Sequence, residues 1–188
     1  VEKNLKKYSV ILPNNYYGEK IKHTINKVQL SRKDFFVNFI YYDPLNPDFY
    51  EVSKTVSDYE NRKIKLEKRL EELSKINSQS AKEKIKKLEK LDTYGELEFD
   101  ALIIFAQNIN EVIALSSILP YYDVDPKQIQ YIGNSTWAKK QVLKEPGLQN
   151  SFFSSIDLES MENFEEIYKT TFKTKPHPLG IFIYDLVG

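Results

Sequence analysis

The sequence has 188 residues, 41% of them hydrophobic, which suits one domain with a well-buried core. Its 27 lysine and arginine residues balance its 27 aspartate and glutamate residues, so no overall charge favours binding to nucleic acid or to an anionic membrane surface. Cysteine is absent, which excludes disulfides and cysteine-ligated metal sites, and no apolar run approaches the roughly 20 residues of a membrane-spanning helix.

The start of the chain predicts a strand, a helix and a second strand. An apolar run over residues 8–12 that ends at Pro13 predicts the first strand. A second strand is predicted over residues 35–42, where Asp43 and Pro44 end it. Between the two strands, apolar side chains recur at the spacing of one helix face, at Ile21, Ile25, Val28 and Leu30.

The segment 57–92 is rich in lysine and glutamate and contains neither glycine nor proline. A long predicted helix runs into this segment, with apolar positions at Phe49, Val52, Val56 and Tyr59. Further apolar residues at helical spacing flank a polar break at Asn77–Ser80, and they predict an antiparallel helical hairpin: Leu66, Leu70, Leu73, Ile85, Leu88 and Leu91. Ser80 and Glu83 have the spacing of a capping box for the returning helix.

Two roles of this hairpin stay open, a partner-binding arm and a solvated spacer. The segment is far longer than a β-α-β crossover requires, which favours an added role. Its high density of charged residues suits a spacer equally well. The apolar residues of its two helices pack against each other, which leaves no apolar surface for a partner. In either case we expect the α/β body to fold without residues 62–90, because the predicted strands lie outside them.

The middle of the chain predicts a complete strand, crossover helix and strand. The continuous apolar run 101–106 is typical of a parallel strand that is covered on both faces, and a second such strand is predicted over residues 129–133. Between them a helix is predicted to stop at Pro120, and Asp125 with Pro126 is predicted to cap a short helical turn. The helix face is formed by Ile109, Val112, Ile113, Leu115, Ser116 and Leu119.

The last third predicts a short helix over residues 137–143, a fifth strand over residues 152–155 and a further helix. That helix has an apolar face of Phe164, Ile167, Tyr168, Thr171 and Phe172. The run 178–186 is apolar throughout and suits a helix or a strand. Strands that alternate with helices predict an α/β fold, namely a three-layer, doubly wound, parallel five-stranded sheet of order 2-1-3-4-5. Residues 1–188 then form one domain, with the helical hairpin 57–92 inserted.

The sequence contains few residues that could act as catalytic groups. The two histidines, His23 and His177, lie far apart in the predicted order. Asp123 and Asp125 have the spacing of a carboxylate pair, but Asp125 with Pro126 has an adequate turn and cap role. Gly18 stands alone before the first helix, without a phosphate-binding glycine pattern. We therefore expect no enzyme, no catalytic residue, no cofactor and no metal.

Polar and aromatic residues follow three of the predicted strands. Because the carboxyl ends of parallel strands meet at one edge of a sheet, we expect these loops to form one site. The members of the group are Asn14, Asn15, Tyr16 and Tyr17, then Gln107 and Asn108, then Asn134, Ser135, Thr136 and Trp137. Such side chains suit ligand cavities and protein interfaces alike, and Trp137 suits a plain core position equally well. The predicted binding residues are Tyr16, Tyr17, Gln107, Asn108, Asn134, Ser135 and Trp137.

Two stretches, FDALIIFAQNINEVIALSSILPYYDVDPKQIQYIGNSTW and LKEPGLQNSFFSS, resemble the second lobe of type I periplasmic binding proteins with the Leu/Ile/Val-binding protein fold. The penicillin-binding-protein-activator branch is the most similar, and LPYYDVDP and LKEPGLQ are the most specific phrases. The resemblance covers nearly all of residues 8–187 and implies that a first lobe precedes residue 1, with 178–186 a helix returning toward it. It also implies that Tyr17, Gln107 and Asn134 face an interlobe cleft.

Amino-acid-binding relatives use an acidic group on this lobe to meet the ligand's ammonium group, whereas Asn134 and Ser135 here are neutral. A buried ammonium without a partner costs several kcal/mol, which favours the regulator branch. The resemblance then implies a non-catalytic periplasmic domain that acts on cell-wall synthesis by contact with an envelope protein such as a peptidoglycan synthase. It implies a lipoprotein anchored to the outer membrane through a segment outside this sequence. The alternative is a substrate-binding protein that delivers a small ligand to an ABC transporter.

Overall fold

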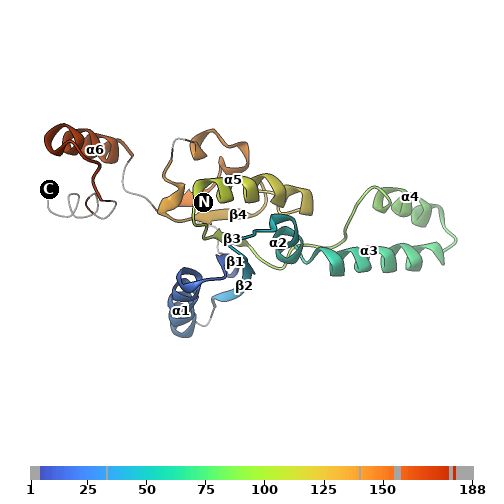
Figure 1. Ribbon diagram of the computed structural model, residues 1–188. Helices are drawn as coiled ribbons and strands as arrows, with labels where there is room; N and C mark the ends of the chain where they lie inside the picture. Colours follow the sequence, from blue (N-terminus) through green and yellow to red (C-terminus); the bar gives the residue numbers. More distant parts are fainter. Residues whose placement is uncertain (1–4, 33, 140, 155–157, 178–179, 181–188) are drawn as a thin grey trace.

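The computed structural model describes residues 5–32, 34–139, 141–154, 158–177 and 180. Its centre is a five-stranded, all-parallel sheet in the order β2-β1-β3-β4-β5 (Figure 1). The strands are β1 Lys7–Pro13, β2 Phe36–Tyr42, β3 Ala101–Ile104, β4 Gln130–Gly133 and β5 Phe152–Phe153. The predicted fold class and strand order are therefore confirmed. The predicted strand 101–106 is two residues shorter in the structure. Of the strand predicted over 152–155, the structure forms Phe152–Phe153, and residue 155 lies outside the described residues.

Helices cover both faces of the sheet. Helix α1 (Tyr16–Ser31) lies on one face beside β1 and β2, while α2 (Phe49–Val56) and α5 (Ile109–Ile118) cover the other face (Figure 1). The main core lies under α2 and α5, where alternate residues of the strands pack on the two helices. It includes Ile11, Ile40, Leu102, Ile104, Val52, Val56, Val112 and Leu115.

The connection from β1 to α1 depends on a glycine and an asparagine. The Asn15 side chain accepts a hydrogen bond from the Gly18 N–H, 3.1 Å away, and so caps the first turn of α1. A Cβ atom at Gly18 would lie 2.0 Å from the Pro13 carbonyl oxygen. Only glycine lets the helix begin this close to the end of β1, so Gly18 serves packing and not phosphate binding.

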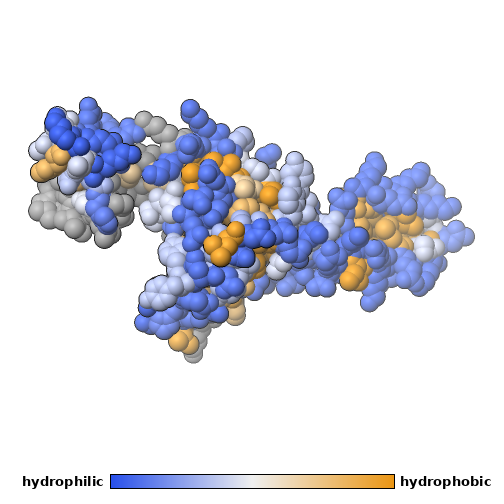
Figure 2. Space-filling model, viewed as in Figure 1, coloured by the Kyte–Doolittle hydropathy of each residue, from blue (hydrophilic) through white to orange (hydrophobic). Residues whose placement is uncertain are grey.

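The predicted hairpin is present, as α3 (Tyr59–Ser74) and α4 (Gln79–Leu88). The helix entering it was predicted to be continuous, but α2 ends at Val56 because Asp58 adopts left-handed backbone angles (φ 52°) and starts a new helix. The predicted cap Ser80 is also wrong. Ser78 caps α4 instead, since its extended backbone lets its hydroxyl accept from the Ala81 N–H at 3.1 Å. Figure 2 shows apolar side chains gathered within the hairpin and hydrophilic ones around them.

Two further predictions about local helices need correction. Helix α5 does end near Pro120, but the chain continues as a 3-10 helix over Leu119–Tyr122, since proline is tolerated in a first turn. The helix predicted over 137–143 is replaced by 3-10 turns over Ser135–Trp137 and Val142–Lys144. A third such turn spans Pro146–Leu148, and the predicted last helix is α6 (Leu158–Phe172). Apart from Gly180, the segment 178–186 lies outside the described residues.

The base of the hairpin is fixed to the body by Arg62, whose side chain is only 7% exposed. Its Nε and Nη2 atoms donate to the Gly95 carbonyl oxygen at 3.2 and 3.0 Å, and Nη2 lies 3.1 Å from Asp123 Oδ2. The Thr93 hydroxyl donates to the same Asp123 oxygen at 2.6 Å. We call Arg62, Thr93, Gly95 and Asp123 the hairpin clasp. It joins α3, the returning chain and the loop after α5.

We expect a chain in which a short Gly-Ser linker replaces residues 67–87 to keep a cooperative thermal transition. The excision removes most of the two arms but leaves the hairpin clasp and every strand in place. Circular dichroism during heating measures the transition. The control is the longer excision 62–90, which removes the buried Arg62 and should melt at a lower temperature. Loss of cooperativity in the shorter variant would show that the arms belong to the core.

Candidate functional site

The loops that follow β1, β2, β3 and β4 meet at one edge of the sheet, as the parallel order requires. Hydrogen bonds connect them. The Asn14 N–H donates to the Tyr42 carbonyl at 2.8 Å, which joins the loops after β1 and β2. The Asn134 side-chain amide donates to the Tyr17 hydroxyl at 2.8 Å, which joins the loop after β4 to the first turn of α1. We call this group of loops the carboxyl edge.

A buried glutamate organises the centre of the carboxyl edge. The Tyr42 hydroxyl donates to Glu111 Oε2 at 2.6 Å, and the Gln107 N–H donates to the same oxygen at 2.8 Å. The Asn108 side chain donates to Glu111 Oε1 at 2.9 Å. With three donors on its two oxygens, the carboxylate is well satisfied where it is buried. Glu111 therefore holds β2, the loop after β3 and α5 together, and it does not present a free general base.

Three of the four predicted asparagines at this edge also have local structural roles. Asn15 caps α1, and Asn108 caps α5 by accepting from the N–H groups of Asn110 and Glu111 at 3.0 and 3.1 Å. Asn134 caps the 3-10 turn after β4. Helix capping alone explains an asparagine at such positions. The side-chain amide of Asn134 does more, because it also contacts Tyr17 from across the sheet.

Exposed side chains at the carboxyl edge are those available to a partner or ligand. Tyr16 is 77% exposed and Tyr17 is 40% exposed, and both lie at the first turn of α1. Gln107, Asn108 and Ser135 are also exposed. The edge thus presents two tyrosines beside amides and a hydroxyl.

Trp137 does not share this exposure. The structure places its ring fully buried in the core, because the 3-10 turn after β4 brings the indole onto the strand backbone at Gly133. A Cβ atom at Gly133 would lie 2.1 Å from the indole ring, so the glycine makes room for it. Among the seven predicted binding residues, Trp137 is therefore a core residue that packs below the carboxyl edge and is not accessible to a partner.

The hydroxyl groups of Tyr17 and Tyr42 are held in their protonated form. Burial raises the pKa of the Tyr17 hydroxyl, while its hydrogen bond with Asn134 lowers it by a smaller amount. Burial also raises the pKa of Tyr42, and the hydrogen bond to the Glu111 carboxylate raises it further. Both tyrosines thus act as neutral hydrogen-bonding groups at neutral pH.

Tyr42 and Glu111 were not predicted as members of the site. Glu111 carries a sequence signal, since it stands three residues after the cap Asn108, the spacing of a capping box. Tyr42 carries none, because an aromatic residue at the end of a strand is ordinary core. Its contact with Glu111 joins residues 69 positions apart, which no local pattern reveals.

Within the part of the chain that the structure describes, no group of three or more histidine, cysteine, aspartate or glutamate residues could hold a metal ion. Asp123 does not form a carboxylate pair with Asp125, because its side chain forms an ion pair with Arg62. The Asp125 side chain accepts from the Lys127 N–H at 2.9 Å, the turn role expected of it. Among the described residues no helix is both long and apolar enough to cross a membrane.

Comparison with family models, with curated proteins and with solved structures found no match to this chain. The likeness to periplasmic binding proteins therefore rests on the phrases quoted from the sequence. The strand order β2-β1-β3-β4-β5 is shared by many unrelated proteins and does not identify a function.

Proposed function

We propose that this chain is a non-catalytic binding and regulatory domain of the periplasm, of the penicillin-binding-protein-activator type, which contacts an envelope protein such as a peptidoglycan synthase. The exposed Tyr16 and Tyr17 at the carboxyl edge are the observation that supports a protein contact. Tyrosines beside amide and hydroxyl groups are typical of interface anchors, because a large rigid ring adds contact area at little entropic cost. An outer-membrane anchor outside this sequence belongs to the same proposal.

The test is binding of the whole chain to purified peptidoglycan synthase domains, measured by biolayer interferometry. We expect Tyr16→Ala to weaken binding by about tenfold or more, as expected for an exposed aromatic anchor. The matched control is Tyr121→Ala, which removes an equally exposed tyrosine from the 3-10 helix after α5, at the opposite end of the sheet. Equal losses for both variants, or no binding by the unaltered chain, would contradict the proposal. Loss of binding on excision of residues 67–87 would add the hairpin to the interface.

The second candidate is a substrate-binding protein of an ABC transporter, with Tyr17, Gln107 and Asn134 in an interlobe cleft. The hydrogen bond between Tyr17 and Asn134 favours it, since it brings two of these groups together. One lobe supplies only half of such a cleft, so we expect weak or no metabolite binding at the carboxyl edge of this chain. Calorimetry that showed tight metabolite binding, lost in Asn134→Ala, would favour this candidate over the regulator.

A further inference from the structure

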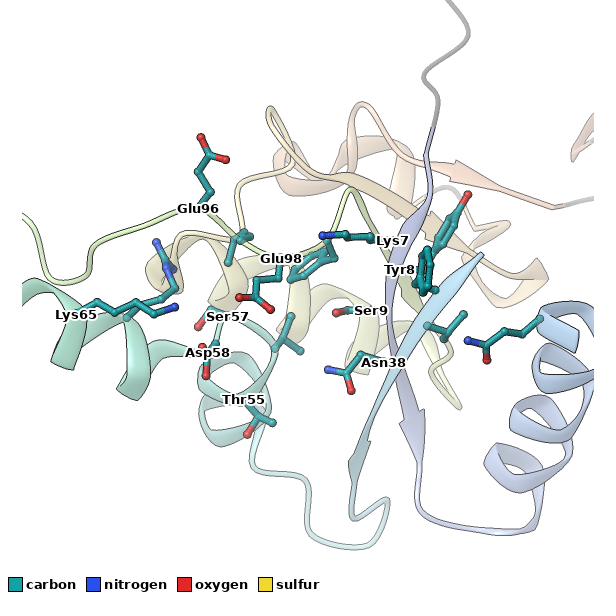
Figure 3. A pocket seen from close by; sticks show the side chains of 17 residues that line it. Lys7, Tyr8, Ser9, Asn38, Thr55, Ser57, Asp58, Lys65, Glu96 and Glu98 are labelled. Carbon is teal, nitrogen blue, oxygen red and sulfur yellow. The ribbon is translucent and has the colours of Figure 1, made fainter. Parts of the chain in front are cut away.

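A pocket of about 550 Å³ lies at the other end of the sheet, away from the carboxyl edge. Its walls come from the first residues of β1 and β2, from the end of α2, from the base of the hairpin and from the segment just before β3. We call this space the amino-end pocket (Figure 3). The function proposed for the carboxyl edge makes no use of it.

One nitrogen of Arg62 lacks a hydrogen-bond partner at this pocket. The residue is only 6% exposed, and its Nε and Nη2 both donate to the Gly95 carbonyl from one edge of the planar guanidinium group. Nη1 lies at the opposite edge, where it is buried and forms no hydrogen bond within the described residues. Arg62 lines the amino-end pocket whereas Gly95 and Asp123 do not, which puts Nη1 on the pocket side of the hairpin clasp. Buried donors of charged groups are nearly always satisfied in folded proteins, so Nη1 points to a partner in the pocket.

The chemistry of Nη1 determines what kind of partner it takes. A guanidinium nitrogen only donates, so its partner is an acceptor, and an anionic oxygen is the acceptor that binds it most strongly. Lys65 also lines the pocket, and it stands one turn after Arg62 on the same side of α3. Lys7 adds a second ammonium group from the start of β1. Neither lysine forms an ion pair within the described residues.

Carboxylates at the same pocket limit the charge of that anion. Asp58, Glu96 and Glu98 balance the three cations of the lining, although Figure 3 shows the Glu96 carboxylate directed away from the pocket. With the charges balanced, no general field attracts anions, and binding depends on direct contact with Nη1. A dianion such as phosphate would meet repulsion from Asp58 and Glu98. A singly charged carboxylate therefore suits the pocket best.

The apolar part of the lining indicates what the carboxylate is attached to. Val56, Leu97 and Phe99 also line the pocket, and Val56 and Phe99 belong to the main core. Ligand pockets of this kind combine an apolar wall with a few polar groups that orient the ligand. A short hydrocarbon tail fits this wall.

We propose that the amino-end pocket binds a small carboxylate with a short apolar tail. One carboxylate oxygen accepts a hydrogen bond from Arg62 Nη1, the other meets the Lys65 ammonium group, and the tail lies against the apolar wall. The site is separate from the carboxyl edge and does not depend on the function proposed for that edge.

Titration of the whole chain with butyrate at neutral pH, followed by two-dimensional NMR, tests this proposal. We expect saturable shifts at the backbone amides of Ser57 and Leu97, which line the pocket, and at the side-chain Nε–H of Arg62. Butyramide, which has the same shape without the charge, should bind at least tenfold more weakly. Acetate should bind about tenfold more weakly, because it lacks two methylene groups of the tail. Phosphate should also bind more weakly than butyrate.

Two variants test the residues that hold the carboxylate. Arg62→Lys keeps a positive charge but has no Nη1, so butyrate binding should weaken by tenfold or more. Lys65→Gln changes an exposed residue that the fold does not depend on, and it should weaken butyrate binding about threefold to fivefold. Melting curves establish that both variants remain folded.

Lys63→Gln is the matched control, because it removes the same charge from the same helix at an exposed position that does not line the pocket. It should leave butyrate binding as it is. The absence of saturable butyrate shifts would overturn the proposal, since water would then be the partner of Nη1. Equally tight binding of butyramide or phosphate would overturn it too. So would unchanged butyrate binding in Arg62→Lys, or equal losses in Lys63→Gln and Lys65→Gln.

Discussion

Trp137→Ala is expected to lower the free energy of unfolding by about 3–5 kcal/mol, the usual loss for truncating a buried tryptophan. The side chain is fully buried among residues of β4, α5 and the loops after β4. Its ring packs directly on the Gly133 backbone, and its centroid lies 6.5 Å from that of Phe153. Urea unfolding followed by far-UV circular dichroism measures the change, since the variant loses the only tryptophan fluorophore.

Two companion variants separate the causes of this loss. Trp137→Phe keeps an aromatic ring and removes an indole N–H that has no hydrogen-bond partner within the described residues, so it should cost much less than the alanine variant. Gly133→Ala keeps the indole but inserts a methyl group into it, and should cost about 1–3 kcal/mol from overpacking. A Trp137→Ala protein as stable as the unaltered chain would show that this ring is not part of the core.

Arg62→Ala is expected to lower the free energy of unfolding by about 1.5–3 kcal/mol, the range for hydrogen bonds that involve a charged group. The substitution removes both donors to the Gly95 carbonyl and the cation that faces Asp123. Asp123 is half exposed, so water can solvate its carboxylate once the arginine is gone. The loss of stability therefore arises mainly from the hydrogen bonds between the buried Arg62 side chain and the Gly95 carbonyl.

Arg69→Ala is the matched control for this prediction. Arg69 lies on the same helix and forms an ion pair with Glu72 at 3.0 Å, but both side chains are exposed. Exposed pairs contribute about 0–1 kcal/mol, so this variant should stay close to the unaltered chain in urea unfolding. If the two arginine variants lost the same stability, the hairpin clasp would be no stronger than a surface pair.

The order and direction of the strands were predictable because each strand is a short apolar run between turn residues, and because parallel strands require crossovers of one hand. The breaks within helices were less predictable. Asp58 starts α3 through a left-handed backbone conformation, and nothing in its neighbours' periodicity marks that position. Ser78 and Ser80 are both good caps by type, and only the backbone angles of the folded chain select Ser78.

The carboxyl edge was predictable as a place, because every loop after a parallel strand opens there. The contacts that organise it were not, since Tyr42 with Glu111 and Tyr17 with Asn134 join residues far apart in the chain. Trp137 shows most clearly what the sequence alone could not predict. A tryptophan just after a strand suits either an open edge or the core, and the 3-10 turn that places it in the core is visible only once the chain has folded.

The hairpin has a consequence for the rate at which the chain folds. The central strands β1 and β3 pair although 87 residues separate Pro13 from Ala101 in sequence, and such distant pairing slows folding. A helical hairpin forms from local contacts and closes on itself, as the hydrogen bond from the Tyr94 N–H to the Arg62 carbonyl at 3.1 Å shows. Once formed, it brings residues 62 and 94 together and shortens the effective loop between β2 and β3. We expect stopped-flow refolding of the chain that lacks residues 67–87 to proceed at nearly the rate of the unaltered chain. A markedly faster refolding would show that formation of the hairpin limits the folding rate.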